Sequence, residues 1–353
     1  MLQLKKETVA LLEDIERRID PAVEEDLAAQ WRDFLYGKFE GDLFSARRKK
    51  PTEPGVDYPD VHINDAIDDL ELMLQHCLRD VSLHLSTDTL NPCVRANYGT
   101  GILPSLFGAE LFMMPRNTAT LPTTLPFHDT EKIRARVEKG MPDLLGGLGQ
   151  RVFDFGELCA EVFAHYPNIQ KYAEVYHPDT QGPLDVCELL WGSEMCLAMY
   201  DEPELVHGML RLVTDTYTAF LEKWFGYFPM HPEMSTHWAS LRHRGGIVLR
   251  DDSAMNLSPE LYKEFAAPYD AELLKHFKGG VVHFCGRGDH YMETLCSIPD
   301  LTGVNMSQPD YNDMEVIYRN TEDKGIPLLA FHRPRAEADL GREGGFHHRM
   351  SVV

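Results

Sequence analysis

Apolar residues in the first 90 positions recur every three or four residues, which is the period of an amphipathic helix. This spacing is present in "MLQLKKETVALLEDIERRID", "EEDLAAQWRDFLYGKF" and "INDAIDDLELMLQHCL", and Asn64 is a candidate cap for the third helix. Between the second and third stretches lies the polar, proline-bearing segment "SARRKKPTEPGVDYPD". It predicts a loop whose basic cluster, Arg47 to Lys50, faces solvent.

From about residue 91 the pattern changes to short apolar runs that alternate with helical stretches. The runs read as strands are found in "CVRANYG", "YAEVY", "GIVLR", "GVVHFC", "TGVNMS" and, last, "IPLLAF". Such alternation predicts an α/β protein with a parallel sheet covered by helices. The glycine-rich "GTGILPSLFG" lacks the spacing of a dinucleotide-binding fingerprint. We therefore expect a (β/α)8 TIM barrel over residues 91–353, with residues 1–90 as an N-terminal helical extension packed on it.

Composition narrows the class of protein. The chain has 353 residues, 43% of them hydrophobic, which suffices for a large core. A formal charge of -22, without a basic stripe, argues against a nucleic-acid partner. The N-terminal stretch has no continuous apolar segment, and no window approaches the run of about 18 apolar residues that spans a membrane. We expect a soluble, cytoplasmic protein, and its odd number of cysteines, 7, predicts free thiols.

Polar side chains follow five of the predicted strands where each strand ends. Because the active sites of barrels gather at the carboxyl ends of the strands, we expect these groups to converge on one pocket. Apolar walls are expected from Tyr98, Tyr176 or Trp238. The polar groups are His177 and Asp179; Asp251 and Asp252; His283 and Cys285; Asn305 and Ser307; His332 and Arg333.

His283 and Cys285 are two residues apart, so in a strand both side chains point to one face, as two metal ligands would. Further residues around them carry a family resemblance. They are "GPLDVCELLWGSEMCLAMYDEPELVHGMLRLVTD" and "DDSAMNLSPELYKEFAAPYDAELLKHFKGGVVHFCG", with Ser258-Pro259 as a helix start. From Thr180 to Phe331 the chain resembles the uroporphyrinogen decarboxylase superfamily of (β/α)8 barrels.

The superfamily has two main branches. True uroporphyrinogen decarboxylases grip the substrate's propionates with an arginine-rich N-terminal stretch; here Arg95 stands alone in a comparable place. The other branch is the cobamide-dependent methyltransferases, in which His-x-Cys and a later cysteine hold zinc. This resemblance implies Zn²⁺ on His283 and Cys285 and a corrinoid carried by a partner protein.

The third zinc ligand of that branch has no matching cysteine here, because none follows Cys296. A catalytic zinc takes about three protein ligands and one open position. The substitute has to come from a histidine or a carboxylate, and we include His332 in the predicted set. The other candidates are His347, His348, Asp251 and Asp252.

Three functions follow from these residues. The first is a corrinoid-linked methyltransferase for a small methylated compound or thiol acceptor, with Asp252 and His283 catalytic. Its substrate-binding residues would be Tyr98, His177, Asn305 and Arg333. The second is a metal-free decarboxylase or lyase of a small carboxylate or tetrapyrrole-like substrate, and the third is a non-catalytic barrel that binds a small molecule. Only the first predicts a metal, so a metal assay separates it from the others.

Overall fold

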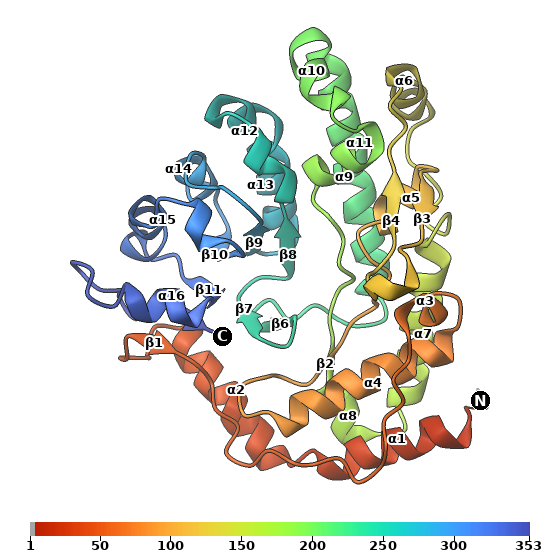
Figure 1. Ribbon diagram of the computed structural model, residues 1–353, viewed down its shortest axis with the longest axis vertical. Helices are drawn as coiled ribbons and strands as arrows, with labels where there is room; N and C mark the ends of the chain where they lie inside the picture. The colour runs from red at the N-terminus through yellow and green to blue at the C-terminus, as the bar shows by residue number, and fades with distance from the viewer. Residues whose placement is uncertain (1–3) are drawn as a thin grey trace.

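Six parallel strands form the main sheet of the protein (Figure 1). In the computed structural model, which describes residues 4–353, they lie in the order β1-β12-β11-β10-β9-β8. The strands are β1 (Leu43–Phe44), β8 (Ile247–Arg250), β9 (Gly280–Phe284), β10 (Leu301–Met306), β11 (Leu328–Phe331) and β12 (Met350–Val352). The predicted adjacency of the strands that contain "GVVHFC", "TGVNMS" and "IPLLAF" is confirmed.

A second parallel pair joins β2 (Cys93–Val94) to β5 (Glu174–Val175). Two antiparallel hairpins complete the sheets: β3 (Glu110–Phe112) with β4 (Thr123–Leu125), and β6 (Ser235–His237) with β7 (Leu241–His243). In the described part of the chain no strand ladder joins β1 to β2 or β5 to β8. The structure thus shows a mixed α/β protein with a six-stranded parallel sheet, and the predicted closure of a barrel is not seen.

Other hydrogen bonds cross the two gaps between the sheets. Between β5 and β8, the Val248 N–H donates to His177 Nε2 at 3.0 Å, and the Gly182 N–H donates to the Arg250 carbonyl at 2.8 Å. Between β1 and β2, the Arg48 guanidinium donates to three carbonyl oxygens of the segment that leads into β2. Side chains and loops therefore connect strands whose backbones do not pair.

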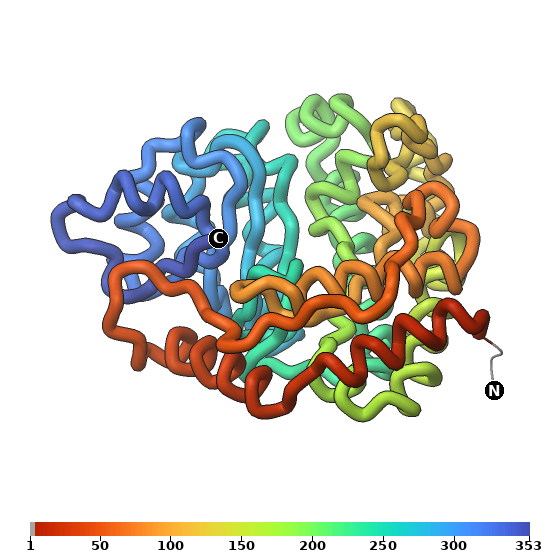
Figure 2. The backbone as a smooth tube through the Cα atoms, turned by 60° about the horizontal axis from the view of Figure 1, so that its bottom comes forward, coloured from red at the N-terminus to blue at the C-terminus, as the bar shows by residue number. Residues whose placement is uncertain are grey.

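The first 90 residues contribute more than helices. α1 (Lys6–Arg18) and α2 (Pro21–Leu35) run along one side of the molecule (Figure 2), and β1 follows them as an edge strand of the main sheet. The predicted loop after β1 is confirmed, but the prediction that all of its basic cluster faces solvent is wrong. Arg48 is buried, and its guanidinium pairs with the Glu24 carboxylate at 2.8 Å. Each buried charge thus has an opposite charge beside it in place of water.

Helices cover the sheets. One large core holds most of the buried apolar side chains, and a smaller one joins α2 to β8, β9 and β11. The third predicted helix is split in two, because Asp69 rather than Asn64 caps the longer part by accepting the Glu71 and Leu72 N–H groups. In the remaining N-terminal half the helices are α3 (Ile63–Ala66), α4 (Leu70–Ser86), α5 (Ile102–Leu106), α6 (Thr130–Lys139), α7 (Gly149–Phe163) and α8 (Pro167–Tyr172).

The C-terminal half supplies helices that precede β8 and helices that alternate along the chain with β8 to β12 (Figure 1). The predicted start at Ser258-Pro259 is confirmed, since Ser258 Oγ accepts the Leu261 N–H. No described helix is long and apolar enough to cross a bilayer. The helices are α9 (Pro183–Trp191), α10 (Glu194–Asp201), α11 (Pro203–Trp224), α12 (Pro259–Phe265), α13 (Ala267–His276), α14 (Met292–Leu295), α15 (Met314–Asn320) and α16 (Arg333–Ala338).

Candidate metal centre

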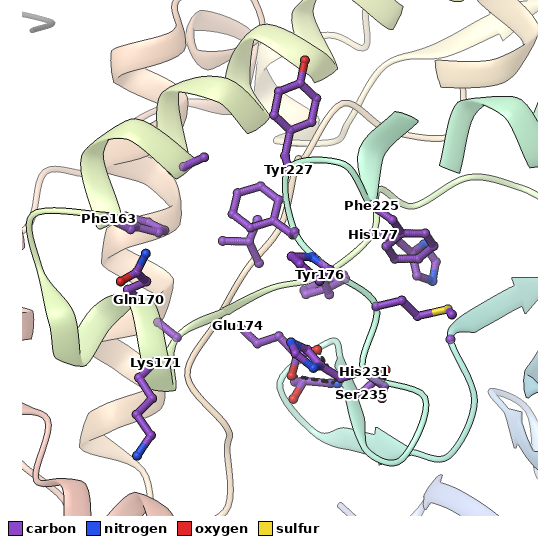
Figure 3. A pocket seen from close by; sticks show the side chains of 18 residues that line it. Phe163, Gln170, Lys171, Glu174, Tyr176, His177, Phe225, Tyr227, His231 and Ser235 are labelled. Carbon is purple, nitrogen blue, oxygen red and sulfur yellow. Dashed lines mark hydrogen bonds between the residues drawn. The ribbon is translucent and has the colours of Figure 1, made fainter. Parts of the chain in front are cut away.

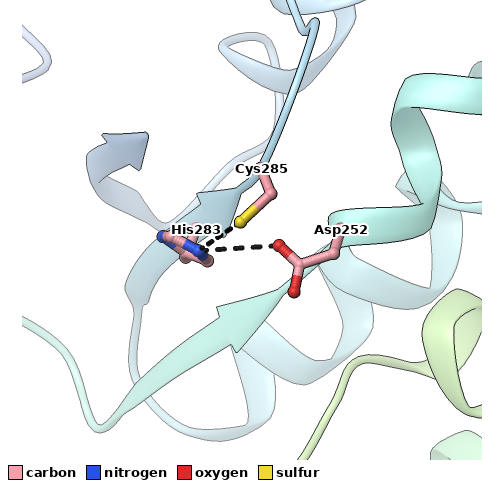
Figure 4. A group of neighbouring side chains, drawn as sticks. All are labelled: Asp252, His283 and Cys285. Carbon is pink, nitrogen blue, oxygen red and sulfur yellow. Dashed lines mark hydrogen bonds and ion pairs between the residues drawn. The ribbon is translucent and has the colours of Figure 1, made fainter. Parts of the chain in front are cut away.

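Three potential metal ligands meet where β8 and β9 end. His283 lies in β9, Cys285 follows that strand directly, and Asp252 opens the short 3-10 helix η2 (Asp252–Asn256) after β8 (Figure 4). One nitrogen, one sulfur and one oxygen from these residues all lie within 4.8 Å of one another. No other cluster of three histidine, cysteine or carboxylate donors this close occurs among residues 4–353.

The two distances from His283 suit a tetrahedral ion. His283 Nε2 lies 3.5 Å from Asp252 Oδ1 and 3.5 Å from Cys285 Sγ. Zinc bonds of about 2.0–2.3 Å at tetrahedral angles put neighbouring ligand atoms roughly 3.3–3.8 Å apart. In addition, Asp252 Oδ1 accepts no hydrogen bond from any described residue, although it is shielded from solvent. The residues present therefore fit a divalent metal with nitrogen, oxygen and sulfur donors.

The neighbouring strand fixes the proton of His283. Asn305 Nδ2 donates to the Leu329 carbonyl at 2.6 Å, which sets the orientation of its amide and turns Oδ1 toward His283 Nδ1 at 2.5 Å. Nδ1 must then carry the hydrogen, and the lone pair of the neutral ring is on Nε2, the atom nearest Asp252 and Cys285. Burial lowers the pKa of His283, which favours this neutral form. A carbonyl partner on the far ring nitrogen is the usual support of a metal-bound histidine.

Cys285 is half-buried, and its sulfur lies 3.5 Å from Ser307 Oγ as well as from His283. Burial raises the pKa of its thiol to about 11, so without a cation the group is a thiol at neutral pH. A bound divalent metal would reverse this preference, since coordination deprotonates a thiol. The other six cysteines are free as well, as the sequence predicts.

Two consecutive carboxylates follow β8, and the fold gives them different surroundings. Asp252 is partly exposed and reaches His283, whereas Asp251 is fully buried beside Asp270 of α13. Burial raises the pKa of Asp251 well above its ordinary value. The turn itself is held by Asp185 of α9, whose carboxylate accepts the Asp252 and Ser253 N–H groups at 2.9 and 2.7 Å. Asp185 thus positions Asp252, and no motif in the sequence indicates this role.

A buried ionic cluster borders the candidate centre. Asp179 forms ion pairs with both Arg95 and Arg250, and its Oδ2 accepts the Trp238 indole N–H at 3.3 Å. The Trp238 ring meets His283 edge-on with centroids 5.0 Å apart, so it forms one wall beside the metal group. The two arginines hold the pKa of Asp179 well below its usual range despite complete burial. The sequence pattern marked Asp179 and Trp238 as pocket residues but not this arrangement.

Several predicted pocket residues lie elsewhere. His332 is exposed at the start of α16, where Arg333 faces Glu337 of the same helix at 3.9 Å, and neither residue belongs to the three-ligand group. Tyr98 is fully buried in the main core, with its ring against Phe155. Asp252 therefore occupies the place beside His283 and Cys285 that the sequence reading gave to His332.

The other histidines predicted as pocket residues or metal ligands form contacts that hold the fold together. His177 is buried, its Nδ1–H donates to the Pro178 carbonyl and its Nε2 accepts the Val248 N–H. His347 and His348 lie after α16, bonded to Asp323 and to the Gly41 carbonyl. None of these three histidines is among the donors that meet at Asp252.

A cavity of about 280 Å³ lies at the other end of the strands, beside the start of β5 (Figure 3). Aromatic side chains from α7 and from the segment after α11 form much of its wall, and Tyr176 and His177 line it as well. Tyr176 therefore borders this cavity and not the group around His283. The cavity is separate from the candidate centre, which none of its lining residues belongs to.

Comparisons with known proteins point to one fold. No protein-family model matches the chain, and no curated protein matches its sequence. Among solved structures, a methyltransferase from Methanosarcina mazei is similar with a TM-score of 0.57 and 15% sequence identity. The similarity covers 93% of this chain and 92% of that one. At this identity the comparison shows that the chain shares its fold with that methyltransferase over nearly its whole length.

Proposed function

We propose that this protein is a metal-dependent methyltransferase of the uroporphyrinogen decarboxylase superfamily, with a barrel-like fold that is interrupted at two gaps. The observation that carries the proposal is the close group of Asp252, His283 and Cys285 at the ends of β8 and β9. The fold shared with a methyltransferase and the sequence resemblance support the reaction class. Zn²⁺ is the proposed ion, because imidazole, thiolate and carboxylate are all within its ligand range.

In this proposal His283 Nε2, Cys285 Sγ and an Asp252 oxygen hold the ion and leave one position open. When bound, the metal supplies a positive centre that lowers the pKa of an acceptor thiol. The protein's own residues then position the ligands: Asn305 orients the His283 ring, and Asp185 fixes the turn that carries Asp252. Trp238 shields one side of the group from water.

The methyl donor in this proposal is a corrinoid presented by a partner protein. The acceptor sulfur would form a bond to the methyl carbon as the bond from that carbon to the corrinoid breaks, the corrinoid would keep the electron pair of that bond, and the thiol proton would be released to solvent. Methyl transfer is thus a nucleophilic displacement that needs no oxidant or reductant. The corrinoid donor and the thiol acceptor are taken from the sequence resemblance to the cobamide-dependent methyltransferases.

Metal content of the untagged full-length protein tests the proposal. After removal of metal with a chelator and addition of Zn²⁺, elemental analysis is expected to find about one zinc per chain. Asp252→Asn, His283→Ala and Cys285→Ser should each lower that content strongly. His332→Ala and Cys296→Ser are matched controls outside the group and should leave it unchanged. Absence of zinc in the wild type, or equal zinc in all variants, would contradict the proposal.

A metal-free decarboxylase or lyase is the second candidate function. It is favoured by one contact, the 3.5 Å approach of His283 Nε2 to Asp252 Oδ1, since a carboxylate–imidazole pair can move a proton unaided. A carboxylate-bearing substrate would require a free cation, yet Arg95 and Arg250 are already paired with Asp179. The metal-free lyase would be favoured over the metal-dependent methyltransferase only if the chelator-treated protein retains full activity on its substrate.

A further inference from the structure

A second, basic pocket lies at the opposite end of the main sheet from the candidate metal centre. Its volume is about 270 Å³, and Leu301 at the start of β10 and Pro327 before β11 line its base. Arg244, His347, His348 and Arg349 supply basic side chains around it. We refer to this cavity as the basic pocket.

The two arginines of the basic pocket have unused charge. Arg349 Nη1 donates to the Gly325 carbonyl at 3.2 Å, and the Arg244 guanidinium lies over the Tyr36 ring at 5.4 Å. Within residues 4–353 neither guanidinium forms an ion pair, whereas arginines such as Arg48 and Arg342 do. In a chain of formal charge -22, two unpaired guanidinium groups at one cavity mark a place where an anion is favoured.

The histidines of the pocket are held by neighbouring groups. His348 Nδ1 donates to the Gly41 carbonyl at 2.8 Å, so Nε2 of the neutral ring is left as an acceptor. His347 Nε2 is bonded to Asp323 at 3.1 Å, and that carboxylate is also bonded by Arg342. Both histidines have positive φ angles, 50° and 62°, a conformation that is unfavourable for residues with a Cβ atom. The turn that presents them is therefore strained.

Apolar side chains complete the cavity. Phe39, Ile326 and Pro327 are partly exposed and line the basic pocket beside the guanidinium groups. A wholly inorganic anion would leave these surfaces wet, whereas an organic anion would cover them. Guanidinium groups match the oxygens of a phosphate better than a point charge does, because their donors form a fork.

We propose that the basic pocket binds a small organic phosphate, with the phosphate on Arg244 and Arg349 and its apolar part against Phe39, Ile326 and Pro327. The site lies apart from Asp252, His283 and Cys285, so it does not depend on the metal or on the proposed methyl transfer. Occupancy of the pocket would link the start of β10 and β11 to the turn before β12.

Calorimetric titration of the full-length protein with phenyl phosphate, at constant ionic strength, tests the site. We expect saturable binding in the wild type and weaker binding of inorganic phosphate, which lacks the apolar part. Arg349→Ala should weaken phenyl phosphate binding at least tenfold, and Arg349→Lys should have an intermediate effect because it keeps the charge but not the fork. His283→Ala, which removes a proposed metal ligand, should bind phenyl phosphate as the wild type does.

Arg319→Ala is the matched control, since Arg319 is an exposed arginine of α15 outside the basic pocket. It removes the same charge and is expected to leave the affinity within twofold. An equal loss in Arg319→Ala and Arg349→Ala would show general attraction and overturn the site. Absence of binding to the wild type at millimolar phenyl phosphate would overturn it as well. Because Arg349→Lys preserves the charge and most of the side chain, it remains informative if Arg349→Ala does not fold.

Discussion

His283 and Asn305 face each other across β9 and β10, with His283 Nδ1 2.5 Å from Asn305 Oδ1. The contact follows from strand register, because the two residues are direct partners in the parallel ladder. It leaves the lone pair of His283 Nε2 directed at Asp252 and Cys285. The candidate metal centre is therefore prepared by a residue that is not itself a ligand.

Asn305→Leu should reduce zinc affinity by about 10- to 100-fold, because the His283 ring loses the acceptor that fixes its tautomer. Asn305→Asp keeps an oxygen at that position and should retain most of the affinity. Competition with a chromophoric chelator measures both values. Equal affinities in the wild type and Asn305→Leu would show that the hydrogen bond has no role in the metal site.

His177 joins β5 to β8 through its side chain, so replacing it should weaken this gap. His177→Leu leaves the buried Val248 N–H without an acceptor, which we expect to cost about 1–3 kcal/mol of unfolding free energy. Amide hydrogen exchange should accelerate at Val248 more than at Val281 in the paired strand β9. His177→Gln, which offers an amide oxygen, should recover part of the loss. An unchanged rate of amide exchange at Val248 in His177→Leu would contradict a stabilising role for the hydrogen bond from Val248 to His177.

Arg48 and Glu24 form a bidentate pair, with contacts of 2.8 and 3.0 Å, and both side chains are almost fully buried. Arg48→Ala should destabilise the protein by about 3–5 kcal/mol in urea unfolding, since it leaves the buried Glu24 carboxylate without a charged partner. Arg47→Ala removes an exposed partner of Asp88 and should cost less than about 1 kcal/mol. Similar losses of unfolding free energy in the two variants would mean that burial does not raise the contribution of the Arg48–Glu24 pair to stability.

The buried carboxyl of Glu322 should make the free energy of unfolding decrease as the pH rises. Burial raises the pKa of its carboxyl from the ordinary 4.5 to about 8. The folded state thus binds a proton that the unfolded state has already released, and the stability present below pH 4.5 is lost as pH rises through 8. Glu322→Gln should therefore be more stable than the wild type at pH 9, by on the order of 5 kcal/mol.

Chemical unfolding of Glu322→Gln at pH 5 and pH 9 measures this difference. At pH 5 the two proteins should be more nearly equal, because the wild-type carboxyl is then protonated in the folded state. Glu343→Gln changes an exposed carboxylate and should give parallel curves with the wild type at both pH values. A Glu322→Gln variant that is less stable than the wild type at pH 9 would refute the buried neutral carboxyl.

Local signals in the sequence were sufficient to predict several elements. Alternating apolar runs predicted β9, β10 and β11 as neighbours, and the i, i+2 spacing put His283 and Cys285 on one side of β9. Ser258 and Pro259 predicted the start of α12 for the same reason, since capping depends on residues within one turn. Each of these signals depends on a few consecutive residues.

The remaining parts could be seen only in the three-dimensional structure, because they depend on strand register and on chain segments far apart in sequence. The structure places Asp252, rather than Asp251 or His332, beside His283, and it places Asn305 opposite the same ring. It also brought β1 beside β12, two short strands whose residues carry no clear period. Pairing between such distant segments is fixed by packing of the whole core, which no local pattern records.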